Sequence, residues 1–180
     1  MQTFLMVTCA CLFFAACVIP VSCKGTQELR VSVRLTTGER SKDSNSETMT
    51  ITVERDAIVS ARTFGGSSSR RPVPPRKVYQ LSAIDKENLI KLISANNLLV
   101  TDSIKHTQAG ANYRYFELSV GLTLDEKKGV INISALRTAV KVKEEQLYRR
   151  TLALVEELYR IMNRQDRSIR LEELILEPIR

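Results

Sequence analysis

The single histidine, His106, is the side chain best suited to acid–base chemistry, and Asp102 and Ser103 lie just before it. These three residue types make up a hydrolase triad, in which the histidine takes the proton of the serine. Closeness in sequence is not triad geometry, and no serine lies in a Gly-x-Ser-x-Gly or Ser-x-x-Lys motif. We therefore expect that the protein is not an enzyme. The alternative is a hydrolase that uses His106.

Neighbouring carboxylates occur at Glu144-Glu145, Glu156-Glu157 and Glu172-Glu173. Consecutive helix positions point about 100° apart, so a helical pair of this kind does not aim both carboxylates at one site. Such residues usually form solvated ion pairs along a helix, as Glu156 would with Arg160. Gly65-Gly66 lacks the lysine of a phosphate-binding loop. These patterns predict no cofactor.

All four cysteines, Cys9, Cys11, Cys17 and Cys23, fall within the first 23 residues. A disulfide framework would distribute them among the strands and loops that it joins. A metal site would need further ligands close by, yet the first charged side chain is that of Lys24. We predict that the cysteines belong to a leader and that the mature chain holds no metal.

The leader is apolar from Phe4 to Ile19 except for Thr8 and the cysteines, and Pro20 ends the run. This length fits the apolar region of a signal peptide and is short for a transmembrane helix of about 20 residues. No lysine or arginine precedes the run. We predict export, with a retained anchor helix as the alternative.

Two cysteines follow small residues, in Phe14-Ala15-Ala16-Cys17 and in Pro20-Val21-Ser22-Cys23. Both segments resemble the bacterial lipobox, whose cysteine is lipid-modified and becomes the new N-terminus. Both depart from it, with phenylalanine or proline where leucine is usual. The resemblance implies a lipid-anchored protein, with Cys23 slightly ahead of Cys17 as the modified residue and simple secretion as the alternative.

The formal charge is +7, from 27 lysines and arginines against 20 acidic residues. Most basic residues have an acidic neighbour, which is the usual solubilising pattern. The exception is a basic patch of Arg70, Arg71, Arg76 and Lys77. We do not expect the protein to bind nucleic acid. We expect its partner to be either an envelope protein or an anionic ligand.

Alternation of apolar and polar residues predicts half-buried antiparallel strands. A hairpin turn is expected at residues 55–56 and a hairpin loop at residues 125–129. The predicted strands cover residues 28–36, 48–54, 57–64, 77–81, 116–124 and 130–134.

Two helices are expected. Ser82 and Asp85 form a capping box that begins the first, which ends near Asn96 with Ile84, Leu89, Leu92 and Ile93 on one face. The second spans residues 142–163 and carries an apolar stripe along one side. Residues 98–100 should return to the core, and residues 169–179 form a short helix or an edge strand.

The predicted fold class is α+β, with an antiparallel sheet of about five to six strands packed on one face by two helices. The uncovered face should present Arg30, Arg34, Thr50 and Thr52. Residues 1–23 form the leader, and residues 24–180 form one domain with a flexible loop at residues 65–76.

This layout resembles that of small bacterial lipoprotein-type envelope proteins. The resemblance implies a non-enzymatic binding or structural protein, tethered to a membrane in the periplasm or on the outer surface. A soluble, secreted inhibitor that inserts the loop of residues 65–76 into a partner is the alternative.

Overall fold

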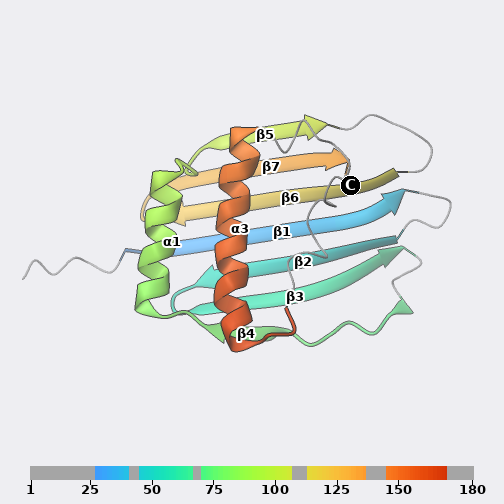
Figure 1. The fold of residues 1–180 in the computed structure, drawn as a ribbon, viewed down its shortest axis with the longest axis horizontal. Helices are drawn as coiled ribbons and strands as arrows, with labels where there is room; N and C mark the ends of the chain where they lie inside the picture. The colour runs from blue at the N-terminus through green and yellow to red at the C-terminus, as the bar shows by residue number, and fades with distance from the viewer. Residues whose placement is uncertain (1–26, 41–44, 67–69, 107–112, 137–144, 170–180) are drawn as a thin grey trace, which may run out of the picture.

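The computed structural model describes residues 27–40, 45–66, 70–106, 113–136 and 145–169. These residues form a seven-stranded sheet whose one face is crossed by helices α1 and α3 (Figure 1). The predicted α+β class, with helices packed on one face, is confirmed. The elements are β1 (Leu29–Arg40), β2 (Asn45–Glu54), β3 (Ala57–Gly66), β4 (Lys77–Gln80), α1 (Ala83–Ala95), β5 (Thr101–His106), β6 (Tyr113–Leu124), β7 (Lys127–Leu136) and α3 (Gln146–Gln165).

The sheet differs from the prediction in size and in one pairing. Its strand order is β4-β3-β2-β1-β6-β7-β5, and β5 runs parallel to β7, so the sheet is mixed. The predicted strands omit the segment of β5, because Ile104 is its one apolar residue and its other side chains are polar. Its pairing with β7 depends on a partner distant in sequence, which alternation alone does not reveal.

The two hairpin turns are tight. Arg55 and Asp125 have φ angles of 55° and 53°, the left-handed conformation that short hairpin turns demand at their first position. Arg55 adopts this conformation without the glycine that usually supplies it. The second turn contains only Asp125 and Glu126, so β7 begins at Lys127, earlier than predicted.

Gly129 lies under the chain that follows α1. A Cβ atom at this position would come within 2.7 Å of the Leu98 carbonyl oxygen and within 2.8 Å of the Leu99 Cα. The Val130 amide also donates a hydrogen bond of 2.8 Å to the Val100 carbonyl. Glycine therefore permits the predicted return of residues 98–100 to the core, where Leu98 is fully buried.

The helix α1 begins as predicted. The Ser82 hydroxyl accepts a hydrogen bond of 3.1 Å from the Asp85 amide. Leu89 and Ile93 are buried, but Ile84 is 72% exposed, so its predicted place on the buried face is wrong. The buried face of α1 is formed by Asp85, Leu89 and Ile93, spaced four residues apart, and Ile84 projects about 100° around the helix from Asp85.

The core lies between the helices and the inner face of the sheet. The apolar stripe of α3 packs on this inner face. The rings of Tyr148 and Phe116 meet edge to face, with their centroids 6.1 Å apart. The hydroxyl of Tyr159 lies 2.7 Å from the Met49 sulfur. Burial raises the pKa of both phenols, to about 12 for Tyr148, so both hydroxyl groups stay protonated near neutral pH. Residue 169 is buried, and the rest of the predicted tail lies outside the described residues.

Candidate functional site: the open face of the sheet

The face of the sheet turned away from α1 and α3 carries small hydroxyl side chains. On each central strand, apolar residues point to the helices and the intervening residues are at least partly exposed. Eight serine and threonine residues lie on this open face in the three central strands: Ser32, Thr36, Ser46, Thr48, Thr50, Thr52, Ser119 and Thr123.

Register arranges these residues in rows across the strands. Arg34 lies opposite Thr50 on one side and opposite Ser119 on the other. In the next row, Thr36 lies opposite Thr48 and Glu117. The predicted exposure of Arg30, Arg34, Thr50 and Thr52 on the uncovered face is therefore confirmed.

Some hydroxyl groups of the open face form hydrogen bonds with neighbouring side chains. The Thr36 and Thr48 hydroxyl oxygens are 3.0 Å apart, and the Ser119 hydroxyl donates to the Asn132 side-chain oxygen at 2.8 Å. A hydroxyl has one donor and two acceptor sites, so each retains capacity for an outside partner. The open face thus offers closely spaced donors and acceptors.

Arg34 is the cation at the centre of this surface. Its side chain is exposed, and none of the residues that the structure describes forms an ion pair or hydrogen bond with it. Arg30, by contrast, pairs with Glu28 at 2.6 Å. A guanidinium presents five N–H donors in a fixed plane, which suits a carboxylate or phosphate.

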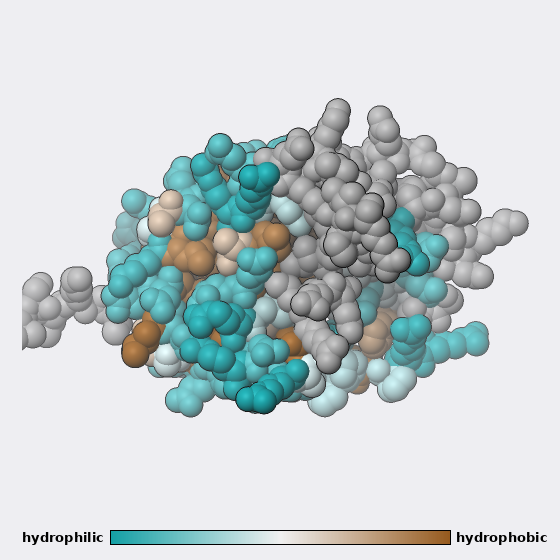
Figure 2. All heavy atoms as spheres, in the orientation of Figure 1, coloured by the Kyte–Doolittle hydropathy of each residue, from teal (hydrophilic) through white to brown (hydrophobic). Residues whose placement is uncertain are grey.

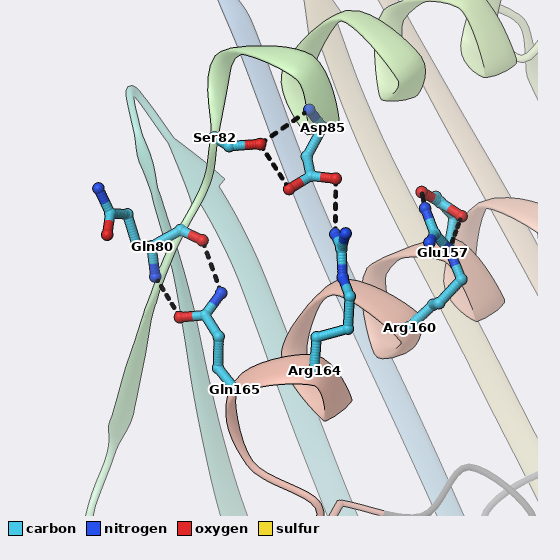
Figure 3. A network of polar contacts seen from close by, with 7 residues as sticks. All are labelled: Gln80, Ser82, Asp85, Glu157, Arg160, Arg164 and Gln165. Carbon is cyan, nitrogen blue, oxygen red and sulfur yellow. Dashed lines mark hydrogen bonds and ion pairs between the residues drawn. The ribbon is translucent and has the colours of Figure 1, made fainter.

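The strongest polar network lies on the other side of the molecule and is structural (Figure 3). Asp85 accepts hydrogen bonds of 2.7 Å from the Ser82 hydroxyl and 2.6 Å from the Arg164 guanidinium. Burial of Asp85 opposes its ionisation, but these two bonds outweigh burial and lower the pKa of the carboxyl below its ordinary value. All three polar groups are used in joining α1 to α3.

A second connection in Figure 3 protects the edge of the sheet. The Gln165 amide accepts from the Gln80 backbone N–H at 2.9 Å and donates to the Gln80 carbonyl at 2.8 Å. Nearby, Lys77 pairs with Asp166 at 2.5 Å, and bonds from Lys77 and Ser168 lower the pKa of Asp166 to about 2. The end of α3 therefore covers β4 with side-chain hydrogen bonds.

The proposed triad residues lie at the opposite edge of the sheet. His106 ends β5 and pairs with Ala135. The Asp102 carboxylate accepts a hydrogen bond of 2.7 Å from the Ser103 backbone N–H. Consecutive strand residues project to opposite faces, so Asp102 and Ser103 do not serve one site. The geometry gives the hydrolase hypothesis no support.

The loop and leader hypotheses fall partly outside the described residues. Gly65 and Gly66 end β3, and the Arg71 guanidinium carbon lies 5.9 Å from the centre of the Phe64 ring, a cation–π distance. Residues 67–69 and both candidate lipidation sites, Cys17 and Cys23, are not described. Lipid attachment therefore stays a prediction.

Seen from the helix side, the described surface is largely hydrophilic (Figure 2). The apolar residues of α3 are buried in the core, so this stripe is not offered to a partner helix. Among the described residues, no group of three His, Cys, Asp or Glu side chains is placed to hold a metal ion. No helix in the described ranges has the length and apolar character needed to cross a membrane.

Comparison of the chain with models of known protein families and with curated proteins found no match.

Proposed function

We propose that the protein is a non-enzymatic binding protein of the cell envelope, exported and tethered by a lipid on Cys23 or Cys17. The observation that carries the binding role is the open face, where Arg34 lies among rows of hydroxyl groups. The core packs on the other face, so substitutions of the open-face side chains leave the packing of the core unchanged.

The chemistry of the open face favours an anionic or hydroxyl-rich partner surface. Arg34 supplies the charge, and the rows of threonine and serine supply neutral donors and acceptors around it. The serine and threonine side chains around Arg34 are short, which leaves its guanidinium accessible to a broad partner. An envelope protein with a carboxylate at the centre of its contact surface fits this description.

Charge reversal at Arg34 tests the role of the open face. Arg34→Glu and the exposed Arg167→Glu should be compared for cross-linking to proteins of the native envelope. We expect Arg167→Glu to keep the partner of the wild-type protein, and Arg34→Glu to lose it at least about tenfold. Equal capture by all three proteins would remove the open face as the binding site.

Tethering is tested separately in a bacterial host. The intact mass of the mature protein reports the cleavage site and any acyl chains together. Detergent partitioning of Cys23→Ala and Cys17→Ala variants then identifies the modified cysteine, since stable anchoring takes more than one acyl chain or a further contact. A mature protein without acyl chains would leave simple secretion as the explanation.

A further inference from the structure

A cavity of about 170 Å³ lies on the helix side of the sheet, away from the open face. It is formed where β2, β3 and β4 meet the chain that follows α3. Part of its wall is apolar, from Met49, Pro74, Pro75 and Ile169. The polar residues Ser60, Arg62, Lys77 and Tyr79 line the same wall.

The Tyr79 hydroxyl is a buried polar group without a partner. The residue is 4% exposed, and its hydroxyl forms no hydrogen bond with any residue in the described ranges. Buried polar atoms are almost always bonded, so an exception calls for a bound molecule or water, or for a function. A phenylalanine would fill the same space without this unsatisfied group.

The charged groups around the cavity are donors. Arg62 makes one ion pair, to Glu47 at 3.4 Å, which leaves most of its N–H groups for another acceptor. Lys77 is held at the rim by its pair with Asp166. A molecule that satisfies Arg62 and Tyr79 together must present acceptor oxygens, and a carboxylate does so for both.

The size and the apolar wall favour an organic molecule over a bare anion. An engineered apolar cavity of about 150 Å³ takes up benzene. A cavity of about 170 Å³ is therefore large enough for a six-membered ring. The prolines and Ile169 give the ring an apolar surface to pack on.

We infer that this cavity binds a small organic carboxylate, with its oxygens toward Arg62 and the Tyr79 hydroxyl and its apolar body against Pro74, Pro75 and Ile169. This site is separate from the open face and does not depend on the proposed function.

Benzoate is the probe, used with the full mature protein and followed by calorimetry and by backbone amide NMR shifts. We expect saturable binding, with the largest shifts in β3 and β4 near Ser60 and Lys77. Benzamide has the same shape without the charge and should bind about tenfold more weakly or worse. Equal binding of benzamide and benzoate, or no saturable binding of benzoate, would overturn the inference.

Tyr79→Phe separates a binding role from a packing role. Removal of the unsatisfied hydroxyl should raise the Tm of the free protein by about 2–4 °C. The same change should weaken benzoate binding by about 2- to 10-fold. A stabilised variant that binds benzoate as tightly as the wild type would show that the hydroxyl serves no carboxylate.

Arg62→Gln should weaken the affinity for benzoate by about tenfold or more and leave the affinity for benzamide unchanged. Arg76→Gln is the matched control, because Arg76 is exposed, lies beside Lys77 in sequence and does not line the cavity. Its affinity for benzoate should equal that of the wild type. Loss of affinity in both variants alike would indicate attraction to the overall charge, which also contradicts a defined site.

Discussion

At the scale of single residues, two glycines on neighbouring strands have opposite requirements. Gly129 faces inward, and backbone atoms of residues 98 and 99 lie where its Cβ would be. Gly121 lies on the open face opposite Ser32, and the nearest atom to its Cβ position is the Ser32 Cβ at 3.9 Å, an ordinary contact distance. Both glycines lie within strands, but close packing requires a glycine only at position 129.

Alanine at each glycine tests this difference. Gly129→Ala should lower the free energy of unfolding by about 1–3 kcal/mol or more, because backbone atoms must move to admit the methyl group. Gly121→Ala should be neutral or stabilise by up to about 1 kcal/mol, because glycine weakens a strand interior. Urea denaturation followed by circular dichroism measures both. Equal effects would contradict the close approach at Gly129.

Asp85 is the residue whose ionisation should control stability in acid. Its folded-state pKa is lowered, so the ionised carboxylate stabilises the folded protein at pH values above about 4. That contribution is lost as the pH falls below this value toward the lowered pKa. We expect Asp85→Asn to reduce the free energy of unfolding by about 1–3 kcal/mol at pH 7.

The difference between Asp85→Asn and the wild type should shrink as the pH is lowered from 4 toward 2. Urea titrations over that range measure it, and the other carboxyl groups, including Asp166, act equally on both proteins. A difference that stays constant down to pH 2 would contradict the ion pair with Arg164.

At the scale of elements, the end of α3 protects the edge strand β4. An uncovered edge presents free backbone groups to other chains, and the Gln165 side chain occupies both backbone groups of Gln80. The Asp102 carboxylate has a similar effect at the other edge, where it accepts from the Ser103 N–H. Each edge strand thus has a backbone donor bonded to a side chain.

Gln165→Ala should free the Gln80 backbone without altering the core. We expect faster hydrogen exchange at the Gln80 amide, with unchanged exchange in the central strands β1 and β6. Gln146→Ala removes a glutamine from the other end of α3, where its partner is the exposed Arg150, and is the control. If the Gln80 amide stays protected from exchange in Gln165→Ala, a group other than Gln165 must be responsible for that protection.

The elements that sequence predicted well are those with a regular period. The alternation in β1, β2 and β6 located their strands and open faces, and the capping box located the start of α1. Patterns that depend on distant partners were missed. The sequence of the edge strand β5 is polar and resembles that of a loop. Arg160 forms its ion pair with Glu157, at 2.5 Å, and not with the expected Glu156.

The binding surfaces were predictable to different degrees. Exposure of Arg34 follows from strand alternation, because one face of an antiparallel sheet meets solvent. The cavity near Tyr79 had no sequence signal. It is lined by residues from three strands, from the segment before β4 and from the segment after α3, and only the fold brings Pro74 and Ile169 together.

At the scale of the whole molecule, the strand order raises the question of whether the chain is two weakly related halves. Hairpins followed by a helix occur twice along the sequence. The two halves meet at β1 and β6, which pair in continuous register from Leu29 with Leu124 to Arg40 with Tyr113. The boundary between the halves is therefore the centre of the sheet.

Helix α3 joins the halves a second time. It crosses the strands of the sheet (Figure 1), and it contacts the second half through Tyr148 and Phe116 and the first half through Tyr159 and Met49. At its end, Gln165 bonds to β4. Neither half keeps its buried surface if the other unfolds, because the α3 stripe belongs to both.

We therefore predict that the seven-stranded sheet and its two helices unfold in one cooperative transition. Urea curves from far-ultraviolet circular dichroism and from tyrosine fluorescence should have the same midpoint, since Tyr79, Tyr148 and Tyr159 report on different parts of one core. Leu158→Ala, in the fully buried stripe of α3, should lower both midpoints together, at a cost of about 2–5 kcal/mol. Two separate midpoints, or a Leu158→Ala effect on one probe alone, would mean that the halves fold independently and that α3 does not unite them.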